Sequence, residues 1–297
     1  MKTKAIIEKI AHIIFLISAV VAIFAVGAIT IFMFIKGTPA FKSIGFLDLL
    51  FKSEWAPTAT NPTYGIAYII LSSIVATFSA IIISIPIGLL TAVYIAEMAN
   101  NKLGEIVRTA VELLAAIPSV IYGLLGIMIL NPLMYKLERL IFINNPNHQF
   151  TGGSNLLSAI IVLALMILPT IVSVSVSSLN AVSDKLRSAS LALGASKIQS
   201  IFSVVIPAAK SGILTGAVLG IGRALGEAMA INMVAGGVVN FPLPFNSIRT
   251  LTTQLVSEIA YSSGLHRQVL FTVGLILYLF IMFVNFCLLK VRKKEED

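Results

Sequence analysis

Two charged residues stand inside a long apolar run and are the strongest candidates for chemistry in this sequence. Arg223 and Glu227 lie within GIGRALGEAMAINMVAGG, residues 220–237. They are four positions apart, so a helix through both would place them on one face. Holding a charge at bilayer depth costs roughly 2.5–3.5 kcal/mol on insertion scales. Charges kept in such a run therefore indicate a function.

Two interpretations of this pair remain open. Arg223 suits an oxyanion, because its planar donors can hold two oxygens and it stays charged; Glu227 would then tune or gate the passage. Alternatively, the two side chains form an ion pair within one helix and only fix packing. Arg before Glu is the less favourable order for a helical pair, and apolar residues could serve packing equally well.

Weaker candidates follow the apolar stretch 155–180. Thr170, Ser173 and Ser177 recur at helical spacing and could donate hydrogen bonds to an anion that is losing its water. Such hydroxyls more often bond to backbone or join neighbouring helices. The letters VSVSVSS also alternate like a strand, but an isolated strand cannot satisfy its backbone in lipid. We therefore expect a helix here.

The composition places these residues in a membrane protein. Of 297 residues, 58% are hydrophobic and only 11% are charged, whereas soluble domains carry about 25% charged residues. The net charge of +8 does not indicate a nucleic-acid partner, because the basic residues are scattered over short loops and chain ends. The sequence predicts an integral membrane protein.

Six apolar stretches are long enough to cross a hydrocarbon core, which needs roughly 20 helical residues. They cover about residues 10–35, 66–95, 107–134, 155–180, 211–235 and 268–290. The first run extends well beyond the apolar core of a signal peptide, so we expect a retained span. Pro86, Pro118 and Pro169 are expected to kink their spans. The predicted fold class is an all-α, polytopic membrane helix bundle.

The distribution of Lys and Arg predicts the orientation. With a cytoplasmic N-terminus, inside segments carry 13 of these residues and outside segments carry seven. Positive charge accumulates on the cytoplasmic side of membrane proteins. We therefore expect both termini in the cytoplasm and three outside segments, at about 36–65, 135–154 and 236–267.

The cytoplasmic segment 183–212 does not resemble a simple linker. Ser183 or Asp184 can cap a short helix, and Gly194 suits the left-handed residue that closes it. Ser196 opens an S-x-x-Q capping box for a second helix, which we expect Pro207 to end.

This helix–glycine–helix unit carries an apolar face that nothing else in the chain obviously covers. Such a face suits a helix that docks into the groove of a partner protein. An amphipathic helix that rests on lipid headgroups is the alternative.

The residues of this segment carry a resemblance to a known family. Ser188 to Pro207 is similar to the EAA loop of ABC-importer permeases. Ala189, Gly194 and Pro207 fall in place, while Ser188 stands where the family usually has Glu and Ser190 replaces the second alanine. In that family the loop is the coupling helix that docks on the ATPase subunit. The resemblance implies this role for Ser188, Ala189, Leu193, Gly194, Ala195, Ser196 and Pro207.

Other stretches narrow the resemblance to the PstC-type permeases of phosphate-specific ABC importers. They are residues 64–97, ELLAAIPSVIYG at 112–123, GRALGEAMAINMVAG at 222–236, IRTL at 248–251 and residues 269–285. The PstA type has a related Arg…Gly-Glu stretch with a different continuation. Gly237 departs from the pattern, which has Asn after VAG.

This resemblance implies a type I ABC importer permease fold, with one transmembrane domain over 1–297, a core at about 66–290 and a coupling loop at about 183–210. It implies phosphate passage at Arg223 and Glu227 in a bacterial plasma (inner) membrane. The implied partners are a homologous PstA-type permease, two PstB-type ATPase subunits, which bind ATP and Mg, and an external PstS-type phosphate-binding protein. No cofactor is expected on this chain.

The sequence also argues against an enzyme. No G-x-x-x-x-G-K-[ST] loop occurs, so we do not expect this chain to hydrolyse ATP itself. His12, His148 and His266 are scattered and suggest neither a metal cluster nor a catalytic triad. Two rival functions remain: an ABC permease for another oxyanion, such as molybdate or sulfate, and a stand-alone carrier. Carriers commonly show internal repeats, and no clear repeat is visible.

Overall fold

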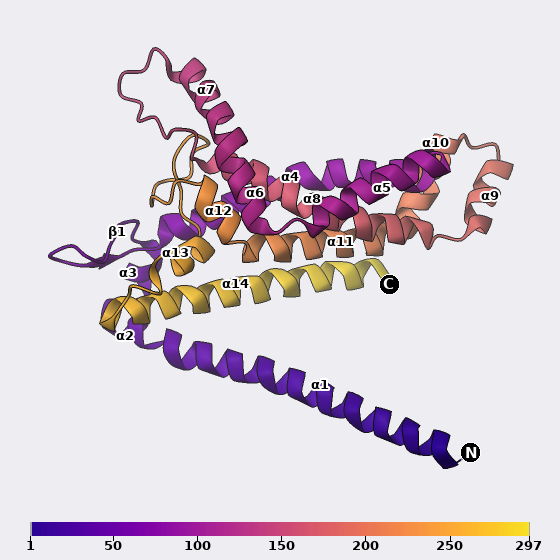
Figure 1. Cartoon of the computed structure of the whole chain (residues 1–297), viewed down its shortest axis with the longest axis horizontal. Helices are drawn as coiled ribbons and strands as arrows, with labels where there is room; N and C mark the ends of the chain where they lie inside the picture. The colour runs from indigo at the N-terminus through magenta and orange to yellow at the C-terminus, as the bar shows by residue number, and fades with distance from the viewer. Residues whose placement is uncertain (1, 297) are drawn as a thin grey trace.

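The computed structural model describes residues 2–296, and the regular structure in this part of the chain is almost entirely helical. The long helices run roughly along one direction, and short helices and loops cover the two ends (Figure 1). The described sheet is a small hairpin, in which β1 (Trp55–Ala56) pairs antiparallel with β2 (Thr63–Tyr64). The predicted all-α class is confirmed.

The helices fall into two groups along the chain. The first half contains α1 (Lys2–Gly37), α2 (Pro39–Ile44), α3 (Phe46–Phe51), α4 (Ala67–Val93), α5 (Asn101–Ala116), α6 (Ser119–Leu125) and α7 (Asn131–Phe142). The second half contains α8 (Leu156–Asn180), α9 (Asp184–Ala192), α10 (Lys197–Ser200), α11 (Ile206–Gly226), α12 (Met229–Val234), α13 (Leu251–Glu258) and α14 (Gly264–Glu296). Three π-helical turns join neighbouring helices: η1 (Tyr94–Met98), η2 (Gly126–Leu130) and η3 (Ile201–Val205).

Six helical segments of the described chain are long and apolar enough to cross a membrane, as predicted. They are Glu8–Ile44, Ala67–Met98, Ser119–Phe142, Leu156–Asn180, Lys197–Gly226 and Gly264–Cys287. The shortest contain 24 residues, or about 36 Å of helix, which exceeds a hydrocarbon core of about 30 Å.

The third span was predicted at 107–134, and this boundary is wrong. The chain breaks at Ile117 and Pro118, where both residues have extended backbone angles. Proline disfavours a helical conformation in the residue before it, so Pro118 ends one helix instead of kinking a longer one. The span therefore begins at Ser119, and α5 becomes a separate helix that precedes it.

The fifth span, predicted at 211–235, is also displaced toward the N-terminus. Helix runs without interruption from Lys197 through η3 into α11 and ends at Gly226. Pro207 lies in the first turn of α11 directly after η3, so it does not end the preceding helix as expected. A π-helical turn alters the hydrogen-bond ladder beside the proline, which has no N–H to contribute.

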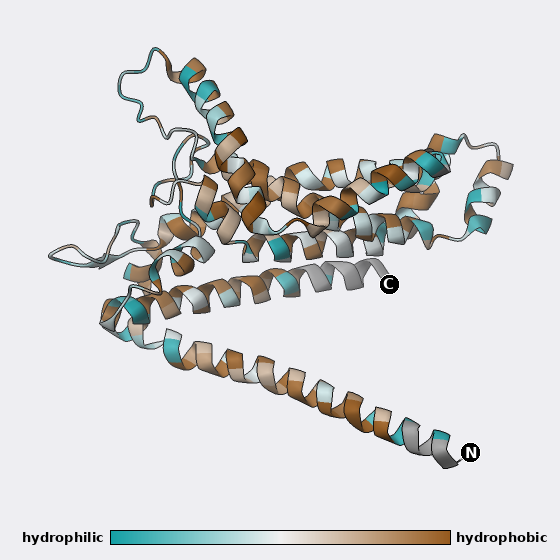
Figure 2. Ribbon diagram, in the orientation of Figure 1, coloured by the Kyte–Doolittle hydropathy of each residue, from teal (hydrophilic) through white to brown (hydrophobic). Residues whose placement is uncertain are grey.

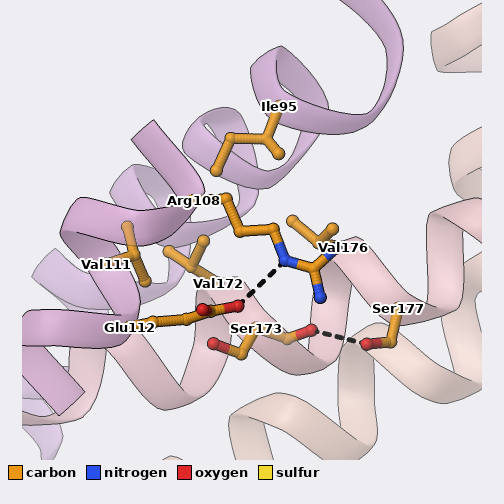
Figure 3. A pocket seen from close by; sticks show the side chains of 8 residues that line it. All are labelled: Ile95, Arg108, Val111, Glu112, Val172, Ser173, Val176 and Ser177. Atoms are coloured by element: carbon orange, nitrogen blue, oxygen red, sulfur yellow. Dashed lines mark hydrogen bonds and ion pairs between the residues drawn. The ribbon is translucent and has the colours of Figure 1, made fainter. Parts of the chain in front are cut away.

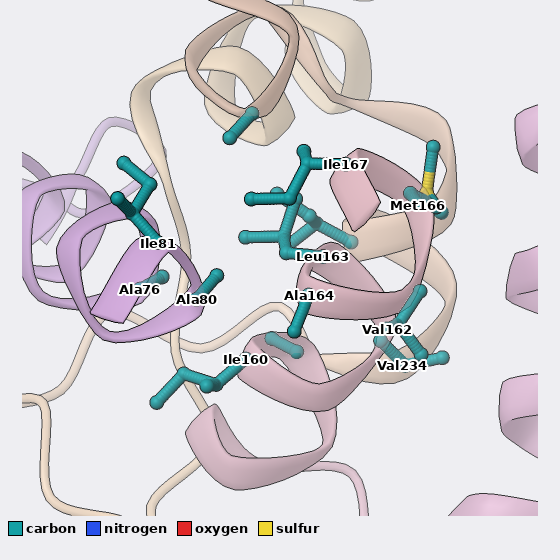
Figure 4. Packing of buried hydrophobic residues seen from close by; sticks show 14 of the residues in the cluster. Ala76, Ala80, Ile81, Ile160, Val162, Leu163, Ala164, Met166, Ile167 and Val234 are labelled. Atoms are coloured by element: carbon teal, nitrogen blue, oxygen red, sulfur yellow. The ribbon is translucent and has the colours of Figure 1, made fainter. Parts of the chain in front are cut away.

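Helix α8 lies at the centre of the bundle and supplies more residues to the largest core cluster than any other helix. Its buried side chains pack against α4, α11 and α12 (Figure 4). Ile171 sits between two glycines: an added Cβ at Gly88 of α4 would lie 2.8 Å from its Cγ2, and one at Gly220 of α11 would lie 3.2 Å from its Cγ1. Small residues at these contacts let the helices approach closely, as in other membrane bundles.

Helix α1 stands apart from this bundle. It contacts α14 and α2 and diverges from the other long helices toward its N-terminus (Figure 1). Its residues are mostly apolar (Figure 2), and many of their side chains are exposed. Phe15 and Phe24 are 73% and 76% exposed. Because the helix satisfies its own backbone, such a surface is stable in lipid.

Candidate functional site

Arg223 lies on the last turn of α11 and points toward α8. Its Nη1 donates a hydrogen bond to Oγ1 of Thr170 over 3.2 Å. The arginine is half-buried, and none of the ion pairs found between described residues involves it. The Arg223 guanidinium therefore lies inside the bundle and keeps N–H groups that have no hydrogen-bond partner in the described structure.

The prediction that Glu227 shares a helical face with Arg223 is wrong. Helix α11 ends at Gly226, and Glu227 has an extended backbone, with φ −73° and ψ 125°. Its Oε1 accepts a hydrogen bond from the N–H of Ala230 over 2.9 Å, at the start of α12. Its carbonyl accepts the hydroxyl of Thr252 over 2.7 Å. Glu227 thus stabilises the break between α11 and α12, and the ion pair within one helix is not formed in the described structure.

The three predicted hydroxyls all lie on α8, but they have different neighbours. Thr170 contacts Arg223, whereas Ser173 and Ser177 face a hollow between η1, α5 and α8 (Figure 3). The Ser177 hydroxyl donates to the carbonyl of Ser173 over 3.0 Å, one turn earlier. Backbone bonding, the ordinary role of such hydroxyls, therefore holds for Ser177.

The hollow also contains a charged pair that the sequence reasoning missed as a site. Arg108 and Glu112 lie four residues apart on α5, and the Arg108 Nε donates to Glu112 Oε1 over 2.9 Å. The helical spacing and the proline after α5 were the signals that could have placed both on a separate amphipathic helix.

Tyr122 is a second residue near the site that the sequence reasoning missed. It is buried on α6, and its hydroxyl donates to the carbonyl of Leu114 over 2.9 Å. This bond spans the break at Pro118 and holds α5 against α6.

The predicted coupling segment forms the expected helix–glycine–helix elbow. Ser183 caps α9, since its hydroxyl accepts from the N–H of Lys185 over 3.3 Å. Gly194 has φ +87°, a left-handed conformation that glycine adopts without strain. Ser196 and Gln199 form the capping box of α10, with reciprocal hydrogen bonds of 3.3 and 2.9 Å.

Apolar side chains cover the outer side of this elbow. Leu193 is 90% exposed at its tip, and Ile198 is 60% exposed on α10. Ser188, Ala189 and Ser196 are also exposed, and Ala195 is half-buried. Pro207 lies outside the elbow, in α11.

Arg187 joins the elbow to the bundle. Its Nη2 donates to Glu97 of η1 over 2.7 Å and to the carbonyl of Leu179, at the end of α8, over 2.8 Å. Its Nη1 donates to the carbonyl of Val182 and to Asp184. The hydrogen bond to Glu97 raises the pKa of Arg187 above its usual value, so the guanidinium stays charged.

The opposite end of the bundle carries two polar clusters of its own. Glu258 on α13 accepts hydrogen bonds from Trp55 of β1, from Arg249 and from His266. Fully buried Glu138 of α7 pairs with His148 over 2.9 Å. These bonds tie the hairpin and the long loops to the helices. Within residues 2–296, no group of three or more His, Cys, Asp or Glu side chains that could hold a metal is found.

A protein-family model and curated relatives match most of this chain. Residues 84–291 match the model described as the binding-protein-dependent transport system inner membrane component. The probable ABC transporter permease protein YqgH of Bacillus subtilis is 35% identical over 277 residues, which cover 90% of this chain and 86% of that protein. The phosphate transport system permease protein PstC of Pasteurella multocida is 33% identical over 270 residues, covering 86% and 83%.

Solved structures share the architecture. The chain resembles a bacterial alginate ABC transporter with a TM-score of 0.61 at 17% identity, covering 90% of this chain and 92% of that one. It resembles the inward-facing MetNI methionine ABC transporter with a TM-score of 0.54 at 23% identity, covering 78% and 94%. The likeness shows the type I ABC importer permease fold.

Proposed function

The chain belongs to the family of inner-membrane components of binding-protein-dependent transport systems, and from this premise we propose that it passes inorganic phosphate. It is a multi-pass permease subunit of an ABC importer. Relatives at 33% identity in Pasteurella multocida and Haemophilus influenzae are phosphate transport system permeases. Their names support phosphate as the substrate of this chain.

The observation that carries the proposal is the placement of Arg223. A half-buried guanidinium that has a hydroxyl partner but no carboxylate in the described structure can offer its remaining N–H groups to an oxyanion. Thr170 accepts from Arg223 and can donate its own proton to the same anion. Glu227 would act differently: by holding the α11–α12 break, it fixes the direction in which Arg223 leaves α11.

The exposed elbow supports a separate ATPase as the source of energy. Leu193, Ile198 and Phe202 present apolar surface in a compact, well-capped unit, which suits docking into a partner's groove. In this proposal the chain pairs with a homologous PstA-type permease, two PstB-type ATPases and an external PstS-type phosphate-binding protein. ATP and Mg bind the ATPases, whose closure pushes the elbows and turns the pathway from outward- to inward-facing.

The proposal is tested with the whole complex in lipid vesicles. We expect phosphate uptake to require ATP and the external binding protein, and R223Q to lower uptake by at least about thirtyfold, as expected when one partner of a buried charge contact is removed. R223K should retain part of the activity. R267Q, which changes an exposed arginine elsewhere, is the matched control.

Three outcomes would contradict the proposal. Uptake driven by an ion gradient without ATP would indicate a stand-alone carrier. ATP-driven uptake of molybdate or sulfate in place of phosphate would indicate a permease for another oxyanion. Unchanged phosphate uptake by an intact R223Q complex would exclude Arg223 from the pathway.

A further inference from the structure

The geometry points to a second oxyanion contact at Arg108, on the same polar face of α8 as Arg223 but nearer the elbow. This inference rests on the proposed function, because it gives the transported phosphate a second place to bind. It concerns the hollow between η1, α5 and α8 (Figure 3).

The hollow presents the groups that an oxyanion needs. Its cavity volume is about 60 Å³, and Arg108 extends over Ser173 and Ser177 in Figure 3. The Nε of Arg108 is bonded to Glu112, whereas Nη1 and Nη2 have no hydrogen-bond partner in the described structure. The two free groups form a fork that can hold two oxygens of one anion. The hydroxyl of Ser173, exposed to the hollow, can add a third donor.

The two arginines lie against the same face of α8, at two positions along the helix. Thr170 and Ser177 are seven residues apart and share that face, which separates them by about 10 Å along the helix. Arg223 from α11 contacts the first, and Arg108 from α5 lies beside the second. An anion that leaves Arg223 toward the elbow would therefore meet Arg108 next.

The carboxylate of Glu112 makes this a site for passage and not for storage. It already neutralises part of the charge of Arg108, and both side chains are more than half exposed. Transport requires binding that is weak enough to let the substrate leave. A wider hollow, lined by Arg108, Gly104 and Asn180 together with Glu105, adjoins the first one. It offers the anion a route out of the hollow, and the negative charge of Glu105 along this route disfavours prolonged binding of the anion.

A plain surface ion pair is the simpler explanation of Arg108 and Glu112, because exposed pairs at this spacing are common on helices. That explanation predicts that phosphate does not change the accessibility of residues in the hollow.

A reporter thiol in the hollow can separate the two explanations. Ile95 lines it, is half-buried and contributes an apolar side chain. The natural cysteine of the chain, Cys287, is replaced by serine in the same background.

The experiment measures how fast a maleimide modifies the I95C/C287S permease in the assembled complex, with and without inorganic phosphate. We expect phosphate to slow the modification severalfold. R108Q should remove this protection and lower uptake by about tenfold, as for the loss of a charge-assisted hydrogen bond. K102Q, a charge change on an exposed residue of the same helix, should retain both.

The outcomes separate this inference from the proposed function. Protection that persists in R223Q, whose uptake is lost, would support two distinct contacts. Absence of protection, or equal protection with and without Arg108, would overturn the inference while leaving ATP-driven uptake through Arg223 intact. Should I95C itself impair uptake, R108Q and K102Q are compared for uptake in the otherwise unaltered chain, and equal rates would overturn the inference. A complex that takes up no phosphate contradicts the proposed function instead.

Discussion

At the residue scale, the hydrogen bond between Arg223 and Thr170 determines which donors of the guanidinium face the pathway. The bond crosses from α11 to α8 over 3.2 Å. It holds one Nη1 proton, and among the described residues the Nη2 group has no hydrogen-bond partner. Hydrogen bonds to charged groups contribute about 1.5–3 kcal/mol, enough to fix the orientation of a long side chain.

We therefore expect T170V to lower phosphate uptake by about tenfold, because Arg223 loses its orienting partner. T170S, which keeps the hydroxyl, should retain most of the rate. T215V is the matched control, because the Thr215 hydroxyl donates to the Ser211 carbonyl within α11. Uptake is measured with labelled phosphate in vesicles. Equal losses in T170V and T215V would show that the packing of α11, and not Arg223, is responsible.

At the element scale, Arg187 connects the elbow to the ends of two spans. Its ion pair with Glu97 is largely buried, and its other bonds reach the last turn of α8 and the residues that follow it. An element pushed from outside can move the bundle only through contacts of this kind. The pair is thus placed to transmit motion from α9 to α4 and α8.

We expect R187Q to reduce the phosphate carried per ATP hydrolysed, while the ATPase subunits still bind. Breaking a buried pair leaves an unpaired charge that costs about 3–5 kcal/mol, so stability must be separated from coupling. The double variant R187Q/E97Q removes that charge and should recover stability but not coupling. The charge swap R187E/E97R should recover part of the coupling. An unchanged ratio of phosphate to ATP in R187Q would contradict this role.

The tip of the elbow gives a second prediction at this scale. L193D places a charge on the most exposed apolar side chain of the elbow, which is 90% exposed, and should prevent co-purification of the ATPase. L243D alters a residue that is 51% exposed in the loop at the opposite end of the bundle, and should leave co-purification intact. If L193D retains the ATPase and L243D loses it, the assignment of the elbow is wrong.

Local sequence signals predicted the elbow well, because each depends on a few neighbouring residues. The caps at Ser183 and Ser196 and the turn at Gly194 all form as expected. Helix ends inside apolar runs were predicted poorly. Hydropathy does not change at Ile117 or Gly226, where backbone geometry ends the helices. The prediction that Arg223 and Glu227 share a helical face failed for that reason. Arg108 was missed because the hollow beside it is completed by residues of η1 and α8, which lie far from it in the sequence.

At the scale of the whole molecule, the start of α1, the end of α14 and the elbow lie at one end of the bundle (Figure 1). The β-hairpin, the α7–α8 loop and α13 lie at the other. An even number of spans requires both chain ends on the same side, which agrees with this arrangement. The excess of Lys and Arg in the segments at the first end predicts that it faces the cytoplasm.

Single cysteines in the C287S background test this orientation in intact cells. N147C lies in the exposed loop after α7, and S196C lies in the elbow. We expect an impermeant maleimide to label N147C in intact cells and S196C only after the membrane is opened. The reverse pattern would place the elbow outside, where it could not reach a cytoplasmic ATPase. Labelling of both sites in intact cells would contradict the six-span topology, because one span, Leu156–Asn180, lies between that loop and the elbow and places them on opposite sides of the membrane.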